Sequence, residues 1–205
     1  VTNALTTLNA ASTAVFTGTG TITPTAAITF GHVTINTGVA ATLAGNISVA
    51  GNWTVNGTGS RSGNFAVTFN GGSAQTIGGS ATIAFYNLTI SNTSGDVTLT
   101  NNASFSNILN FTSGHLILDT YTLTSGASGP QITGYTSARY IVTNSTGKLR
   151  LVNIVDQYDV PIGTSATSYT PAYIDAGAGD AADLSFRVAN SVLDKGTSGA
   201  AKTTD

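Results

Sequence analysis

The chain consists of short runs in which apolar and polar residues alternate at a period of two. These runs include Ala27–Asn36, Asn52–Asn56, Phe65–Asn70, Phe85–Ser91, Val97–Thr100 and His115–Thr124. Alternation places apolar side chains on one face of an extended segment and Thr or Asn on the other. Glycine and asparagine separate the runs, and none of them follows the helical period. The pattern predicts an all-β protein.

A similar series of runs appears twice, at an offset of 55 residues between Phe30 and Phe85. Phe30–Thr37 aligns with Phe85–Asn92. The flanking runs keep their order, with Thr21–Thr23 and Ala41–Leu43 around the first copy and Gln75–Ile77 and Val97–Leu99 around the second. Repetition of a multi-strand unit favours stacked coils that share one core. We therefore predict a β-solenoid, with an internally duplicated β-sandwich as the alternative.

Charged residues divide the chain into two regions. Residues 1–138 contain only Arg61, Asp96 and Asp119, whereas the other thirteen charged residues lie in 139–205. A composition break of this kind marks a domain boundary in a glycine- and proline-containing stretch. We expect a β-solenoid or β-helix-like region over 1–128, with an extended N-terminal arm at 1–14. We expect a β-sandwich-like region with an extended C-terminal tail over 129–205.

Composition limits the classes of partner. The chain has a net charge of −2 and only seven Lys and Arg residues, too few to neutralise a run of nucleic-acid phosphates. It has no apolar run near the roughly 20 residues that a membrane-spanning helix needs. It contains no Cys, and 36 Thr, 20 Ser and 17 Asn supply the polar surface. We expect a secreted, cell-surface protein that binds no nucleic acid and does not insert into a membrane.

Few residues are suited to catalysis. The two histidines, His32 and His115, each precede an alternating run and are interpreted as solvent-facing or turn residues. The chain has no nucleophile elbow, no phosphate-binding glycine loop and no zinc-binding pair. We therefore expect no enzymatic activity, no catalytic residues and no cofactor.

Three carboxylates in the second region are the candidates for a metal site. Asp175, Asp180 and Asp183 lie in a glycine- and alanine-rich segment. Calcium prefers six to eight oxygen ligands, which aspartate-rich loops can provide. The dense Asp-x-Asp-x-Asp-Gly order of known calcium loops is missing, and we favour a solvated hairpin loop.

Aromatic side chains could stack on sugars, and Trp53 and Tyr86 are the candidates. Trp53 alternates with Val55 at a period of two, which favours a core position for the tryptophan. Glycans are therefore the alternative class of ligand.

Several short motifs in a consistent order resemble the repetitive modules of very large secreted surface proteins of Bacteroidetes and their relatives. The motifs are Gly51–Thr54, Val67–Gly71, Ala74–Ile77, Phe85–Ile90, Leu116–Gly126, Tyr140–Asn144, Pro161–Gly163, Tyr169–Pro171, Ser185–Val188 and Gly196–Gly199. The resemblance covers most of the chain from about residue 50. It implies an exported adhesive or structural module without enzymatic residues. Such modules occur in much longer chains, so this chain is either a segment of one or a relative that assembles with copies of itself.

The features together favour a structural subunit or module of a bacterial surface fibre that associates with copies of itself or with neighbouring modules. The candidate contact residues are Val1, Leu5 and Leu8 of the N-terminal arm and Val15, which follows it directly. A carbohydrate-binding adhesin is the first alternative. The second is an ice-binding solenoid, suggested by the pairs Thr21/Thr23, Thr98/Thr100 and Thr122/Thr124.

Overall fold

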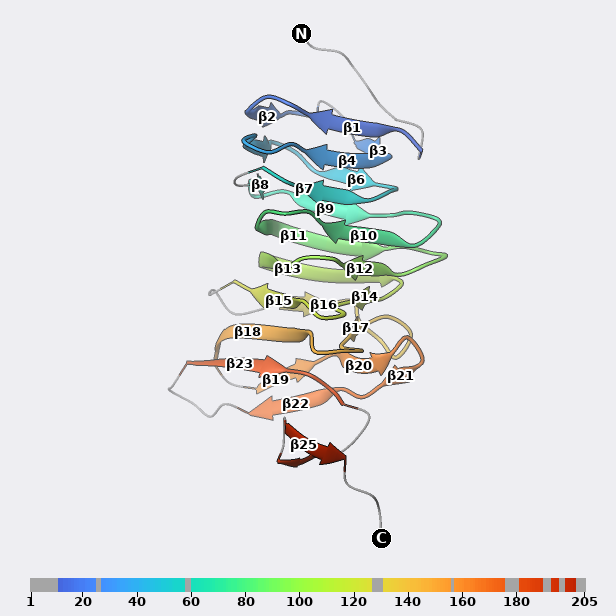
Figure 1. Cartoon of the computed structure of the whole chain (residues 1–205), viewed down its shortest axis with the longest axis vertical. Coiled ribbons are helices and arrows are strands. Elements are labelled where there is room, and N and C mark those ends of the chain that lie inside the picture. The colour runs from blue at the N-terminus through green and yellow to red at the C-terminus, as the bar shows by residue number, and fades with distance from the viewer. Residues whose placement is uncertain are drawn as a thin grey trace.

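The strands stack into a β-solenoid of about seven turns that begins at β1 (Thr13–Phe16), and a separate two-stranded sheet that contains β25 (Ser198–Ala201) lies at the opposite end of the molecule (Figure 1). The computed structural model describes residues 11–24, 27–57, 60–126, 131–155, 157–175, 181–189, 193–195 and 198–201. These ranges contain no helix, and thus no helix that is long and apolar enough to cross a bilayer. The prediction of an all-β solenoid is confirmed.

Each turn contributes strands to three faces. Face 1 is a parallel sheet of β1 (Thr13–Phe16), β4 (His32–Ile35), β7 (Trp53–Val55), β10 (Gln75–Gly78), β12 (Val97–Leu99), β14 (Leu116–Ile117), β17 (Ile141–Val142) and β20 (Ile162–Ser165). Thr13 pairs with His32, 19 positions further on, and Leu116 pairs with Ile141, 25 positions further on. These two offsets are the shortest and the longest turn lengths along face 1.

The other two faces belong to one larger sheet. Face 2 contains β2 (Gly20–Ile22), β5 (Ala41–Leu43), β8 (Ser60–Ser62), the first halves of β11 (Ile83–Ser91) and β13 (Ala103–Ser113), β15 (Thr122–Ser125) and β18 (Lys148–Ile154). Face 3 contains β3 (Ile28–Phe30), β6 (Ile47–Val49), β9 (Ala66–Phe69), the second halves of β11 and β13, and β16 (Gln131–Thr133). The long strands β11 and β13 therefore serve both faces.

The core is built from inward columns in which each residue lies over its partner in the next turn. On face 3 one such column is Phe30, Val49, Phe69, Ile90 and Phe111, each at most 5% exposed. Successive side chains of a strand point to opposite sides of the sheet. Alternation of apolar and polar residues therefore gives an apolar interior and a solvated polar exterior. Burying each large side chain contributes about 1.5–3 kcal/mol.

Asparagines at the corners join successive turns through their side chains. The Asn46 carboxamide oxygen accepts a hydrogen bond from the Ala66 backbone N–H at 2.8 Å. Asn52 accepts one from the Thr76 N–H at 2.9 Å. Such bonds satisfy backbone groups where the sheet pairing stops. The high asparagine content thus has a structural use at the corners.

The 55-residue repeat does not correspond to equivalent positions in the solenoid. His32–Ile35 forms β4 on face 1, whereas the aligned Asn87–Ile90 lies in β11 on face 3. Ala41–Leu43 lies on face 2 and its aligned run Val97–Leu99 lies on face 1. Every strand between this core and solvent needs the same alternation, so strands from different faces resemble one another in sequence.

The β-sandwich-like region expected over residues 129–205 is not confirmed. β16, β17 and β18 pair in parallel with β13, β14 and β15, so the ladders of all three faces continue across residue 128. Among the named strands, antiparallel pairing begins at β18, which pairs with β23 (Ala182–Phe186). The other antiparallel pairs are β19 (Gln157–Val160) with β22 (Ala172–Asp175), β20 with β21 (Ser168–Tyr169) and β24 (Leu193–Lys195) with β25 (Ser198–Ala201). Alternation and charge predict that a segment is a strand but not the direction of its neighbour.

Candidate functional site

Within the part of the chain that the structure describes, the first turn leaves one end of the stack open. β1, β2 and β3 each pair with a strand of the second turn, and no other described strand pairs with their opposite edges. Their inward side chains Phe16, Ile22 and Ile28 are only partly buried, whereas the register partners of these three residues are at most 4% exposed. The end of the core is therefore partly accessible to solvent.

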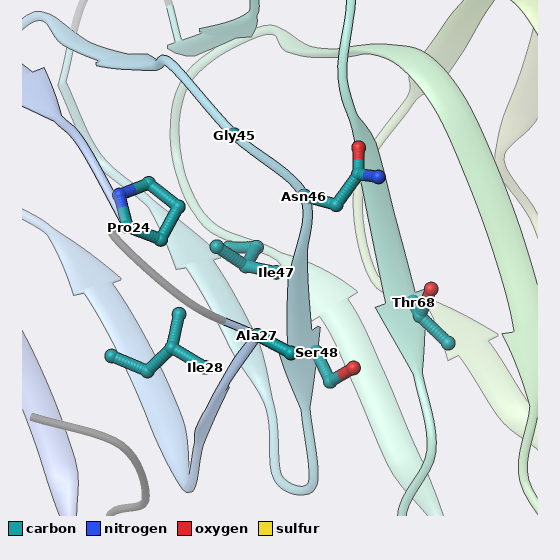
Figure 2. A pocket seen from close by; sticks show the side chains of 8 residues that line it. All are labelled: Pro24, Ala27, Ile28, Gly45, Asn46, Ile47, Ser48 and Thr68. Atoms are coloured by element: carbon teal, nitrogen blue, oxygen red, sulfur yellow. The ribbon is translucent and has the colours of Figure 1, made fainter.

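A hollow of about 330 Å³ lies beside this end on face 3. Ile28 of the first turn and Ile47 of the second lie on neighbouring strands there, with the Pro24 ring next to them (Figure 2). Asn46, Ser48 and Thr68 add polar groups to its lining. The hollow extends the apolar surface of the open end around the corner of the solenoid.

One predicted self-association residue is on the surface of this end. Val15 on β1 is 51% exposed, and the chain has no charged residue before Arg61. An uncharged edge strand offers its backbone groups to another strand without charge repulsion. The other predicted contact residues, Val1, Leu5 and Leu8, lie outside the described residues.

A ladder of hydroxyl and amide side chains runs along the outside of face 3. It consists of Thr29, Ser48, Thr68, Thr89, Asn110 and Thr133, paired in register over six successive turns. The Thr133 hydroxyl donates to the Asn110 side-chain oxygen at 3.0 Å. We call this row the hydroxyl ladder. Neighbouring strands place its rungs about 4.7–4.9 Å apart.

The threonine pairs selected from the sequence do not form this ladder. Thr21 and Thr124 lie on face 2, in β2 and β15, whereas Thr98 lies on face 1 in β12. These threonine pairs therefore do not form one flat surface. In the sequence, the ladder consists of one polar residue per turn. Identifying those residues requires the register of the strands, because the register decides which residue of each turn lies over the one before.

Trp53 belongs to the core. It is 3% exposed and its ring lies 6.0 Å from that of Phe85, at a tilt of 50°. A side chain so buried cannot stack on a sugar at the surface, and the core interpretation of Trp53 holds. Tyr86, the other aromatic candidate, is half-buried and lines a hollow of about 510 Å³ between faces 2 and 3.

The structure brings together a histidine and a carboxylate that are 19 positions apart. His115 Nδ1 lies 2.8 Å from Asp96 Oδ1, and the same oxygen accepts a hydrogen bond from the His115 backbone N–H at 3.0 Å. The His115 side chain is only 12% exposed, and its ring packs edge-on against Tyr140. His115 is therefore not solvent-facing, and it lies in the corner between β13 and β14, which agrees with the turn alternative. The separation of Asp96 and His115 in the sequence equals one turn of the solenoid, and this separation was the feature that could have indicated the pair.

The chemistry of this pair is limited by its surroundings. His115 Nε2 is buried and has no hydrogen-bond partner within the described part of the chain. The hollows around Ser48, Tyr86 and Arg187 are lined by other residues. The pair therefore joins two turns. His32 has a similar role, since its Nδ1 accepts a hydrogen bond from the Asn52 N–H at 2.9 Å.

Two of the calcium candidates, Asp183 and Asp175, have other partners in the structure. The Asp183 carboxylate lies 2.7 Å from Arg150 Nη2 and also accepts a bond from the Asn153 N–H. Asp175 accepts a bond from the Gln157 side chain on the neighbouring strand. Asp180 lies outside the described residues. Among the residues that are described, no three His, Cys, Asp or Glu side chains form a group that could hold a metal ion.

Tyrosines line the C-terminal turns and stay protonated at neutral pH. Burial raises the pKa of Tyr158, whose hydroxyl oxygen accepts a hydrogen bond from the Ile132 N–H at 3.2 Å. Burial also raises the pKa of Tyr140, which donates a bond to the Ser165 carbonyl at 2.6 Å. These hydroxyl groups act as hydrogen-bonding anchors between turns.

Comparisons with family models, with curated proteins and with solved structures gave no match to this chain. The functional interpretation therefore depends on the geometry of the chain itself.

Proposed function

We propose that this protein is a non-enzymatic, extracellular structural protein of a bacterial surface that self-associates through strand contacts at the open first turn. The partly exposed core of that turn carries the proposal. Solenoids need capped ends to stay soluble, because an open end presents both apolar side chains and unpaired backbone groups. A second copy of the chain can satisfy both, by adding a strand to each edge.

A fibre needs a second contact surface that differs from the first, since a head-to-head contact closes after two copies. β22 supplies one. Among the described strands it pairs only with β19, and its Tyr173 is 59% exposed. Contact between the first turn of one copy and β22 of the next is a head-to-tail arrangement that repeats without closing. The resemblance to modules of large surface proteins agrees with an extended assembly.

A charge placed on each contact surface tests the arrangement. We expect Val15→Lys and Tyr173→Lys each to abolish filaments seen by negative-stain electron microscopy, because a lysine on an edge strand must lose its hydration on pairing. A mixture of the two variants should give dimers by light scattering, since each variant keeps one intact surface. The matched control is Thr100→Lys, which adds the same charge to an exposed position of face 1 in the middle of the stack.

Monodisperse wild-type protein at every concentration would overturn self-association. Filaments that persist in both Val15→Lys and Tyr173→Lys would show that association uses other surfaces. Filaments that survive in only one of the two would exclude the head-to-tail arrangement.

The hydroxyl ladder favours a second candidate function, binding to ice. Six successive turns present one hydroxyl or amide group each, at the even spacing of neighbouring strands. The ladder contains no charged residue. Regular donors and acceptors on such a rigid strand array can order water into a matching layer.

Inhibition of ice recrystallisation is the measurement for this candidate. If it is correct, the wild-type chain slows crystal growth, Thr68→Lys in the middle of the ladder removes the effect, and Thr100→Lys on face 1 retains it. Equal activity of the two lysine variants, or an inactive wild-type chain, would reject it.

A further inference from the structure

We propose that the hollow beside Tyr86 is a binding site for a neutral saccharide. The hollow measures about 510 Å³, within the range of small-molecule sites. It lies at the corner between faces 2 and 3, and its lining includes Asn64, Thr82, Ala84, Tyr86, Ser104 and Ser106. This proposal is independent of self-association, because its residues lie in the middle of the stack.

A β-bulge opens the hollow. Phe85 pairs with Phe105, but Asn87 pairs with Ile108, so β13 carries one residue more than β11 across this corner. Ser106 and Asn107 together therefore lie opposite Tyr86. Bulges bend a strand and change the direction of a side chain next to it, and they are frequent beside binding sites.

Gly63 forms part of the lining of the hollow. A Cβ on Gly63 would lie 2.9 Å from the Leu43 carbonyl oxygen and 3.4 Å from the Phe65 ring. Any larger residue at position 63 thus requires the preceding turn to shift, and glycine lets the chain pack closely against that turn.

The chemistry of the lining selects the class of ligand. The ring of Tyr86 can stack on the apolar face of a sugar while its hydroxyl group stays hydrated. Thr82, Ser106 and Asn64 are exposed and carry hydroxyl and carboxamide groups, which donate to and accept from sugar hydroxyls. The Ser104 hydroxyl makes one long bond of 3.4 Å to the Ile83 carbonyl. None of the described residues that line the hollow is charged, and the lining that they form therefore favours a neutral ligand.

Titration of neutral and acidic oligosaccharides into the protein, followed by NMR or calorimetry, tests the site. The probes are cello-, chito- and malto-oligosaccharides and, as the acidic comparison, oligogalacturonate. We expect millimolar binding of at least one neutral series, with oligogalacturonate bound more weakly. The Val15→Lys background is used, so that association of several copies does not raise the apparent affinity.

Three variants identify the residues responsible. Tyr86→Ala should weaken binding by about tenfold, because stacking on the ring is lost. Tyr86→Phe should retain most of the affinity, since the ring is kept. Tyr173→Ala removes an exposed tyrosine outside the hollow and should leave the affinity unchanged. Thermal unfolding of each variant checks that the fold is intact.

Absence of binding by all neutral series, or preference for oligogalacturonate, would overturn the proposal. Equal loss of affinity in Tyr86→Ala and Tyr173→Ala would also overturn it, because the hollow would then not be the site.

Discussion

Replacing Gly79 by alanine is expected to destabilise the protein by about 3 kcal/mol, on the combined cost of backbone strain and overpacking. Gly79 has a φ of 121°, a conformation that residues with a side chain rarely adopt. A Cβ there would also lie against the backbone of Val55, one turn earlier in the stack. Neither strand can move away easily, because β7 and β10 are both part of face 1.

Urea unfolding of the Gly79→Ala variant measures this loss. The matched control is Gly72→Ala, where a Cβ meets no atom within 4 Å and φ is not in the positive range. That change should be neutral or stabilise by up to about 1 kcal/mol, since alanine restricts the unfolded chain. Similar stabilities of the two variants would show that the tight approach between the turns is absent.

The second large effect is expected at Asn92, which is fully buried in a corner of the stack. Its side-chain N–H groups donate to the Ser73 carbonyl at 2.6 Å and to the Gln75 side-chain oxygen at 3.0 Å. Its own oxygen accepts bonds from the backbone N–H groups of Ser94 and Gly95. Asn92→Ala removes all four of these hydrogen bonds, and of the four partner groups the Gln75 oxygen keeps a bond from the Gly71 N–H.

We expect Asn92→Ala to lower the free energy of unfolding by about 3 kcal/mol, because each unsatisfied buried group costs about 1–3 kcal/mol and water can reach some of them. Asn70→Ala, at an exposed corner, is the control and should change stability by less than about 0.5 kcal/mol. Loss of stability at Asn70 as large as at Asn92 would contradict this account of the buried corner.

Gln75 shares the network and should show coupling. Its side-chain N–H groups donate to the carbonyls of Val49 and Gly51, and its oxygen accepts from Gly71 N–H and from Asn92. Because the two side chains are in contact, the double variant Gln75→Ala/Asn92→Ala should lose less than the sum of the single losses. Additive losses would mean that the Gln75 and Asn92 side chains stabilise the fold independently.

Prediction of the candidate sites from the sequence was limited by the variable length of the solenoid turns. The Asp96–His115 contact, the hydroxyl ladder and the hollow at Tyr86 all join residues one or more turns apart. Turn length varies between 19 and 25 residues along face 1, so no fixed offset aligns them. Val15 and Tyr86 were selected on local features alone, the low charge of the N-terminal segment and the presence of an aromatic side chain, and their roles stay predictions.

The sequence by itself determined that the chain forms strands, where most of them lie and which side chains point inward. Trp53 shows this, because alternation with Val55 was enough to favour its place in the core. These properties are local, because the period of two sets the side of the strand on which a side chain lies, and this does not depend on which strand is the neighbour.

Only the tertiary structure decided which strands pair, in which direction and on which of the three faces. The 55-residue repeat matched strands from different faces, and the charge difference near residue 128 was interpreted as a change of architecture although the parallel ladders continue across it. Pairing depends on contacts between residues about a turn apart, such as Asn46 with Ala66 and Leu116 with Ile141. The alternating pattern is alike for every strand, and so it contains no information about the neighbour.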